Sequence, residues 1–177
     1  METIKIIKIR KLKREDLKNI KKFVNYFNSL VKEDAPILFN KKVNSKAMKN
    51  ILQKDVKEIE RKKRIIVVAE DKVSGKIIGI CNISLGKFRE NHIANIAISV
   101  EKNFRGKGIG KALMEKALEN AKSLKPKPKI FMLGVIPTNN IAIKLYKKLG
   151  FKKVAMIPNK IQYKGKLVPE IIMMKKA

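Results

Sequence analysis

The sequence is short of several residue types, and each shortage excludes a class of protein. It has one cysteine, Cys81, in 177 residues, so no disulfide can form within the chain and a cysteine-rich metal site is excluded. No apolar stretch approaches the roughly 18–20 residues that a membrane-spanning helix needs. The first residues carry a charge every few positions and lack the apolar segment of a signal peptide. We therefore expect a cytoplasmic protein with no metal ion and no membrane contact.

Acidic residues are scarce as well. The chain has 15 Asp and Glu against 43 Lys and Arg, a formal net charge of +28. Such a charge favours anionic partners, among them nucleic acid, the ribosome and phosphate-rich cofactors. The lysines are spread along the whole chain, however, and a solvated surface in a lysine-rich composition would look the same. Arginine, the usual reader of DNA bases, is rare, so sequence-specific DNA binding is not expected.

The remaining composition indicates one globular domain over residues 1–177, with 45% hydrophobic residues and no internal repeat. Apolar spacing predicts mixed α/β structure in the order β-α-α-β-β-β-α-β-α-β-β. Glu15 and Asp16 are placed in the first turn of the first helix, and Asn44 or Ser45 caps the second. The predicted strands cover residues 3–9, 65–69, 76–85, 92–100, 129–135, 151–157 and 167–174, and the predicted helices lie near 15–31, 45–59, 109–124 and 139–149.

A glycine cluster, RGKGIGK at residues 105–111, joins a predicted strand to a predicted helix. It does not fit the P-loop, because Lys111 is followed by Ala112 and not by a hydroxyl residue. It does not fit the dinucleotide fingerprint either, because its third glycine comes one position early. Alternate glycines let backbone N–H groups point into one concavity at a helix N-terminus, and flanking bases add charge. This indicates a pyrophosphate cradle; the alternative is a tight turn with surface lysines.

Two segments together resemble a known family. The stretch VEKNFRGKGIGKALMEKALENA is similar to the acyl-CoA motif Arg/Gln-x-x-Gly-x-Gly/Ala of the GCN5-related N-acetyltransferase family, with Arg105, Gly108 and Gly110 at the matching positions. The stretch NNIAIKLYKKLGF, residues 139–151, resembles the Asn-x-x-Ala-x-x-x-Tyr helix of the same family. The predicted element order agrees from residue 3 to 174. The resemblance implies a mixed central sheet of about seven strands, splayed between strands 4 and 5 and flanked by four helices.

The resemblance also implies a binding site for acetyl-CoA as co-substrate. The backbone of Ile98 and Val100 would bond the pantetheine arm in the gap between the two splayed strands. Asn139 would reach the pantetheine as well, and it can cap its helix at the same time. The pyrophosphate would be held by Arg105, Gly106, Lys107, Gly108, Ile109, Gly110 and Lys111.

Tyr146 is the residue that the resemblance assigns to chemistry, as the general acid that protonates the departing thiolate. The alternative is a half-buried aromatic on the apolar face of its helix. A lysine amine has a pKa of roughly 10.4, so a base must also accept a proton. Many relatives carry Glu where this chain has Asn95, which cannot act as a base. The candidates left open are Glu33, Asp34, Glu90, His92 and Glu170; relatives often show Asp-Glu where this chain has Pro169–Glu170.

The acceptor amine is expected in the least informative segments, residues 32–44, 87–92 and 159–167. A small molecule and a protein or peptide amine both remain open, and the positive charge favours an acidic or ribosome-bound peptide over a free polyamine. The alternative function is a basic RNA- or ribosome-binding module on an inactive acetyltransferase scaffold, against which the low aromatic content of 6% argues. Weak non-specific contact with nucleic acid and a homodimer are also left open.

Overall fold

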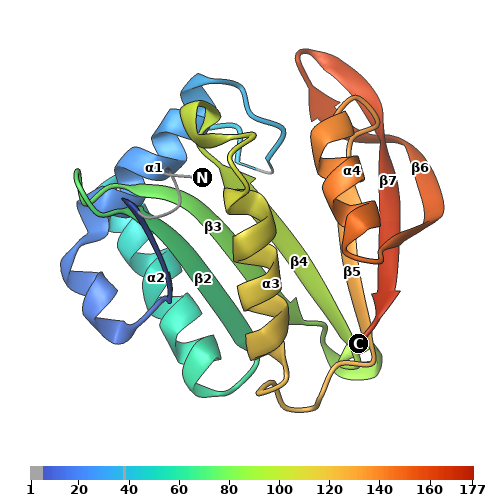
Figure 1. Ribbon diagram of the computed structural model, residues 1–177, viewed down its shortest axis with the longest axis horizontal. Helices are drawn as coiled ribbons and strands as arrows, with labels where there is room; N and C mark the ends of the chain where they lie inside the picture. The colour runs from blue at the N-terminus through green and yellow to red at the C-terminus, as the bar shows by residue number, and fades with distance from the viewer. Residues whose placement is uncertain (1–5, 38) are drawn as a thin grey trace.

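A computed structural model describes residues 6–37 and 39–177. Within these residues the strands form one seven-stranded sheet in the order β1-β2-β3-β4-β5-β7-β6, accompanied by four α-helices (Figure 1). The strands are β1 (Ile7–Lys11), β2 (Arg64–Asp71), β3 (Ile77–Leu85), β4 (Ile93–Val100), β5 (Ile130–Val135), β6 (Lys152–Tyr163) and β7 (Lys166–Lys176). The helices are α1 (Ile20–Lys32), α2 (Ser45–Glu60), α3 (Ile109–Ala121) and α4 (Asn140–Lys148). This confirms the predicted fold class and element order.

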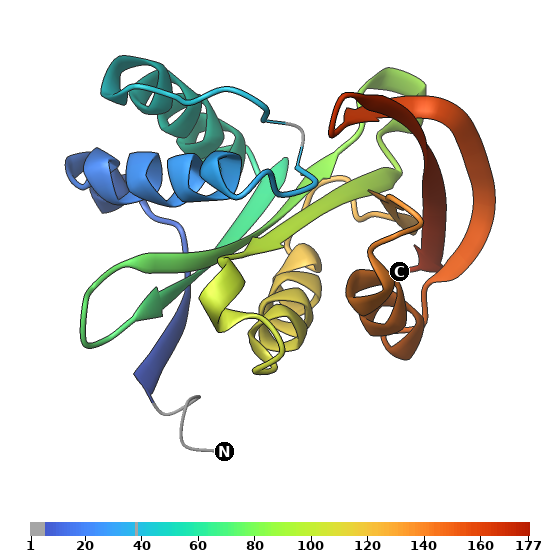
Figure 2. The ribbon, with the colours of Figure 1, turned by 90° about the horizontal axis from the view of Figure 1, so that it is seen from above.

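The helices cover both faces of the sheet, as Figure 2 shows with α1 and α2 on one face and α3 and α4 on the other. Strand alternation divides the apolar residues between these layers. Ile66, Val68 and Ile80 pack with Phe23 and Leu30 beneath α1 and α2. The opposite faces of the same strands pack with α3 in a second core, which contains Val67, Cys81, Ile83, Leu113, Met114 and Phe131. Cys81 is therefore a core residue, as expected, and burial raises the pKa of its thiol to about 12.

The beginning of α1 differs from the prediction. Glu15 and Asp16 lie in a separate 3₁₀ turn, Arg14–Lys18, and α1 starts only at Ile20. The reason is the pairing of Asp16, whose buried carboxylate accepts hydrogen bonds from two nitrogens of Arg10 at 2.8 and 2.9 Å and from the Lys13 N–H at 2.8 Å. These bonds turn the acid toward β1 instead of leaving it at the helix terminus. Asn44 caps α2 as predicted, accepting the Ala47 N–H at 2.8 Å.

The strand limits also differ at both ends of the chain. The predicted first strand began at residue 3, which lies outside the described residues, and the observed one continues to Lys11. β6 was predicted to end at Ile157, before Pro158, yet it continues to Tyr163. A shift in register between Ile157 and Ile161 absorbs the interruption, with Asn159 in the left-handed region at φ 54°. The β6–β7 hairpin is therefore long, and it curls over one face of the sheet (Figure 2).

One parallel pair of strands interrupts an otherwise antiparallel sheet. β4 and β5 pair only at one end, where Ile93–Asn95 lie opposite Ile130–Met132. Beyond that point each strand follows its other neighbour, since β3 pairs with β4 up to Val100 and β7 pairs with β5 up to Val135. The two strands separate in Figure 1 as they rise toward the start of α3. The predicted splay between strands 4 and 5 is thus confirmed, and it leaves one edge of β4 without a partner strand.

Candidate functional site

A cleft of about 650 Å³ follows this open edge. Its lining comes from the end of β4, the glycine loop and first turn of α3, the β5–α4 connection, one face of α4, the α1–α2 connection and the tip of β6. The volume is in the range of a small-molecule site, ~300–1,000 Å³. The lining includes Ile98, Val100, Arg105, Gly106, Gly108, Gly110, Lys111, Asn139 and Tyr146, all of them predicted site residues.

The backbone of β4 offers its free groups to this cleft. The Glu101 N–H donates to the Ile78 carbonyl and the Gly86 N–H donates to the Ile93 carbonyl, both at 2.8 Å, so odd-numbered residues of β4 direct their backbone groups toward β3. Because successive residues of a strand alternate in this respect, Ile98 and Val100 direct theirs toward the open edge. The Val100 carbonyl already accepts a bond from Arg105 Nε at 2.7 Å. The backbone N–H and carbonyl of Ile98 and the Val100 N–H are therefore available to bond a ligand.

Glycine occupies the three alternate positions of the loop for different local reasons. Gly106 and Gly108 have φ angles of +75° and +79°, in the left-handed region that favours glycine. Gly110 has an ordinary helical conformation, but a Cβ there would lie 3.4 Å from Leu145 Cδ2, so its small size lets α3 approach α4. The first backbone bond of α3 runs from the Ala112 N–H to the Gly108 carbonyl at 3.1 Å. The N–H groups of the preceding turn have no acceptor in the helix, and they carry the positive end of its dipole.

The basic side chains around the loop are less available than the sequence analysis expected. The Arg105 guanidinium, besides its bond to Val100, donates from Nη2 to Glu33 Oε1 at the end of α1. Lys107 lies over the Phe104 ring, with Nζ 5.5 Å from the centroid. Lys111 is 3.7 Å from Glu115, an exposed pair of small energetic weight. The anion-binding character of the loop therefore comes mainly from its backbone.

α4 directs Asn139 and Tyr146 into the cleft. Asn139 caps the helix, since its Oδ1 accepts the Ala142 N–H at 3.2 Å, which leaves its amide nitrogen for a ligand. Tyr146 is on the same face, two turns further along. Its ring is only 6% exposed and lies 6.2 Å from the Phe151 ring. Burial, with a smaller contribution from Cys81, raises the pKa of the Tyr146 hydroxyl. The hydroxyl is thus held in the protonated form that a proton donor requires.

The candidate bases are in very different surroundings. Glu33 is bound to Arg105. Asp34 is exposed, with φ at 51°. Glu90 and His92 belong to the β3–β4 connection, at the end of β4 where β5 is still paired. Asn95, which replaces the acid of many relatives, is the last residue of that pairing.

Glu170 lies on β7 beside β5, one of the two splayed strands, although it is not among the residues that line the cleft. Its side chain lies across Gly134 of β5, so that a Cβ at residue 134 would collide with the carboxylate. Within the described part of the chain, Glu170 has no ion pair or side-chain hydrogen bond, although basic residues outnumber acidic ones nearly threefold. It is a half-buried carboxylate that is free to accept a proton or to bind a cation.

Several cleft residues were not predicted individually. Ser99, Ile136 and Thr138 belong to no predicted site, and the others named here were expected only as parts of the acceptor segments. Tyr163 lines the cleft from the tip of β6, opposite Ala35, Pro36 and Ile37 of the α1–α2 connection. No local pattern marks these residues, because only the curl of the hairpin brings them together. Two of the three predicted acceptor segments, 32–44 and 159–167, contribute to the cleft lining, whereas none of residues 87–92 does.

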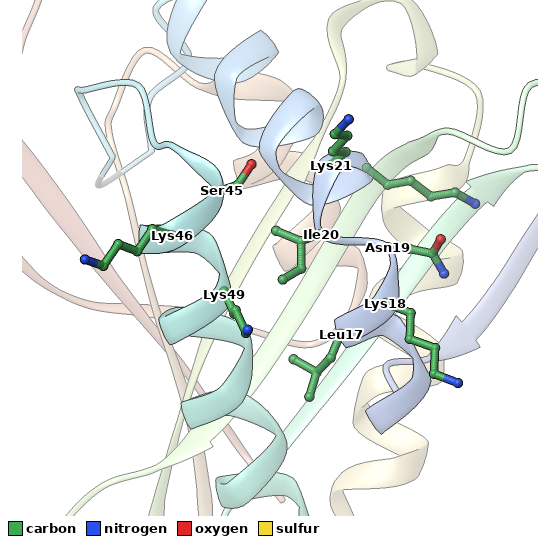
Figure 3. A pocket seen from close by; sticks show the side chains of 9 residues that line it. Leu17, Lys18, Asn19, Ile20, Lys21, Ser45, Lys46 and Lys49 are labelled. Atoms are coloured by element: carbon green, nitrogen blue, oxygen red, sulfur yellow. The ribbon is translucent and has the colours of Figure 1, made fainter.

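A second cavity of about 520 Å³ lies between the start of α1 and the start of α2. Leu17 and Ile20 form its floor, and it is rimmed by lysines (Figure 3). The amines of Lys18, Lys21 and Lys46 point in different directions, so they do not converge on one ligand position. This cavity is separate from the cleft and contributes nothing to the site described above.

The comparisons with known proteins agree with this geometry. Residues 27–151 match the acetyltransferase (GNAT) family. The N-acetylaspartate synthetase of Xenopus tropicalis is 37% identical over 89 residues, which cover 50% of this chain and 32% of that protein. An uncharacterized N-acetyltransferase of Methanocaldococcus jannaschii is 39% identical over 90 residues, covering 48% of this chain and 38% of that protein. The chain thus spans about a third of the length of these curated relatives.

Solved structures share the fold over nearly the whole chain. The ribosomal-protein-S5-alanine acetyltransferase from Vibrio fischeri superposes with a TM-score of 0.81 and 22% identity, covering 97% of this chain and 93% of that one. A phosphinothricin acetyltransferase from Sinorhizobium meliloti in complex with acetyl-CoA gives a TM-score of 0.80 with 17% identity, covering 97% and 88%. At these identities the likeness concerns the fold.

Proposed function

The chain belongs to the acetyltransferase (GNAT) family, and on that premise we propose that residues 1–177 form one domain that transfers the acetyl group of acetyl-CoA to a primary amine. The observation that carries the proposal is a single cleft that joins three features. These are the open edge of β4 at Ile98, the N-terminus of α3 at Gly108, and the Tyr146 hydroxyl. A backbone edge, an anion-binding helix terminus and a proton donor are what a pantetheine, a pyrophosphate and a departing thiolate require.

The residues present fit acetyl-CoA along this cleft. Ile98 and the Val100 N–H would bond the amides of the pantetheine, and the amide nitrogen of Asn139 would face them from α4. The N–H groups from Gly106 to Lys111 would hold the pyrophosphate, with Lys107 and Lys111 adding positive charge. No chemistry here calls for a metal ion, and the described residues contain no cluster of three His, Cys, Asp or Glu side chains that could hold one.

Bound acetyl-CoA would supply a thioester whose carbonyl carbon the amine nitrogen attacks directly, within a ternary complex. The new C–N bond forms as the C–S bond breaks, and the sulfur leaves with the bonding electrons. Tyr146 would donate its proton to that sulfur. The nitrogen gains a positive charge in the attack and must lose one proton. We assign that proton to Glu170, through water where the distance requires it, because Glu33 is already bound to Arg105.

A protein or peptide amine is our proposed acceptor, with a small amine as the alternative class. Pro36 and Tyr163 both line the cleft, and we place the acceptor, an extended chain terminus, beside them. The net charge of +28 attracts an acidic or ribosome-bound peptide and repels free polyamines. We further propose a cytoplasmic location. No helix among the described residues is long and apolar enough to cross a membrane.

Two measurements test the proposed function. Titration calorimetry with acetyl-CoA, ADP and inorganic polyphosphate at two salt concentrations should show acetyl-CoA binding that persists at high salt and far exceeds both controls. Thiol release from acetyl-CoA should then increase with acidic peptides more than with spermidine, compared by kcat/KM. Acetyl-CoA binding no tighter than polyphosphate and lost at high salt would refute the enzyme. A spermidine kcat/KM above that of every peptide would refute the peptide acceptor alone.

The alternative function, an RNA- or ribosome-binding module without catalysis, is motivated by the net charge and by Asn95, which replaces the acid that many relatives carry. Exposed lysines on all four described helices and on β1, β6 and β7 contribute to that charge without a nucleic-acid site. The polyphosphate arm of the calorimetry measures the contribution of charge by itself. Oligomeric state, including a homodimer, is left to a mass measurement in solution.

A further inference from the structure

Arg105 is the first residue of the acyl-CoA motif, yet its side chain already bonds to two groups outside the glycine loop. Its Nε donates to the Val100 carbonyl at 2.7 Å and its Nη2 donates to Glu33 Oε1. The Glu33 side chain is only 15% exposed, so the partnership is partly shielded from solvent. Breaking it would leave a poorly solvated carboxylate without a partner, which is costly. Two of the five N–H donors of the guanidinium are therefore already bonded within the protein.

Glu33 stands at the beginning of the wall on the acceptor side. It ends α1, and Asp34 follows in the left-handed conformation, which directs Ala35, Pro36 and Ile37 into the cleft. The far end of the α1–α2 connection is held by Asn28, which exchanges two hydrogen bonds with the Val43 backbone at 2.9 and 3.0 Å. Phe39 packs on Phe27 between these points, with ring centroids 5.3 Å apart. Both of these contacts return to α1 itself.

The Glu33–Arg105 pair is different because it joins the α1–α2 connection to the loop between β4 and α3. In residues 6–37 and 39–177, no other hydrogen bond or ion pair joins the α1–α2 connection to the segment from Ile98 to Lys111. We propose that this pair is a strap that positions the acceptor wall against the end of β4, and that Arg105 does not bind the pyrophosphate. Cofactor binding at the glycine loop is then coupled through Arg105 to the order of residues 34–44. Only this coupling rests on the proposed function.

The strap itself can be tested in the free protein by amide hydrogen exchange of residues 34–44. Glu33→Gln and Arg105→Gln should each speed exchange there by about threefold or more, since each removes the same ionic contact. The matched controls are Asp34→Asn and Lys102→Gln, which remove the same charges nearby from side chains without a described ion pair. The double variant should exchange no faster than either single one. Unchanged exchange in both single variants, or double-variant effects that multiply, would overturn the strap whether or not the protein is an enzyme.

The assignment of Arg105 is tested by calorimetry with acetyl-CoA. Both Glu33→Gln and Arg105→Gln should bind it within about threefold of the wild type, because backbone N–H groups hold the phosphates. Acetyl-CoA should slow exchange of residues 34–44 in the wild type and in the controls, and this protection should vanish in both strap variants. A tenfold loss of affinity in Arg105→Gln alone would make Arg105 a phosphate ligand and refute the proposal. No acetyl-CoA binding by the wild type would instead refute the proposed function and leave the free-protein test standing.

Discussion

The hydroxyl of Tyr146 can be removed with little change to anything else, which makes Tyr146→Phe the sharpest test of the site. The ring is 6% exposed and packs against Phe151, and phenylalanine preserves that packing. No hydrogen bond from the hydroxyl to another described residue is present in the structure. We therefore expect the midpoint of thermal unfolding to stay within about 2 °C of the wild type, since less than about 0.5 kcal/mol of stability is at stake.

The effect on catalysis should be far larger. A positioned general acid contributes about 10²–10⁴-fold to a rate. A thiolate is a fairly good leaving group, so we expect the lower limit, a kcat about 10²-fold lower. That corresponds to about 2.7 kcal/mol of transition-state stabilisation at 1.36 kcal/mol per decade. The KM for acetyl-CoA should change by less than about threefold, because the hydroxyl acts on the sulfur only as it departs.

The assay is continuous detection of the free thiol with saturating acetyl-CoA. Tyr163→Phe serves as the control, because Tyr163 is the other tyrosine that lines the cleft and has no assigned role in proton transfer. A normal kcat in Tyr146→Phe would show that Tyr146 is only a packed aromatic. A kcat that falls equally in both variants would show that the loss does not report proton donation by Tyr146.

Three further predictions follow from the same structure. Gly108→Ala should lower the stability of the fold by about 1–2 kcal/mol because φ is +79°, and it should also weaken acetyl-CoA binding. The control Gly165→Ala, at φ +71° in the hairpin turn, should lower the stability without weakening acetyl-CoA binding. Equal acetyl-CoA affinities of the two variants would show that the glycine loop is not part of the site. Glu170→Gln should lower kcat/KM, and Gly134→Ala should do the same by displacing the carboxylate; an unchanged kcat/KM in both variants would exclude Glu170 as the base. Burial acts to raise the pKa of Glu70, but hydrogen bonds from Lys22 and Arg10 outweigh it and the pKa is lowered. The ionised form thus stabilises the fold above the unfolded pKa of about 4.3, and that stability is lost as the pH falls through the folded pKa. The urea concentration at the unfolding midpoint should decrease between pH 7 and pH 3 by less in Glu70→Gln than in the wild type. An equal decrease in the two proteins would contradict this prediction.

Local features of the chain were predictable because their causes lie within a few residues. Gly106 and Gly108 mark backbone conformations that other residues avoid, and the strand before them and the helix after them predict a turn whose N–H groups lie at a helix N-terminus. Asn139 caps the helix that carries Tyr146, two turns further on the same face. Alternation and helical spacing predicted the element order, and therefore the splay that this order implies in the family that the motifs resemble. None of this required knowledge of which distant residues meet.

What the sequence could not show depends on contacts between distant segments. Arg105 and Glu33 are 72 positions apart. Nothing in the sequence near Arg105 indicates that its guanidinium pairs with the carboxylate at the end of α1. In the sequence Gly134 is an ordinary strand residue, and only the structure shows that the Glu170 side chain of β7 lies across it. Tyr163 lies at the cleft because β6 continues to pair with β7 beyond the register shift that follows Ile157. By itself, the sequence determined the elements, the loop and the family, because these depend on local backbone preference and side-chain spacing. Only the tertiary structure decided which carboxylate is free and which arginine is engaged, because an ion pair depends on distance in space, which residue spacing does not encode.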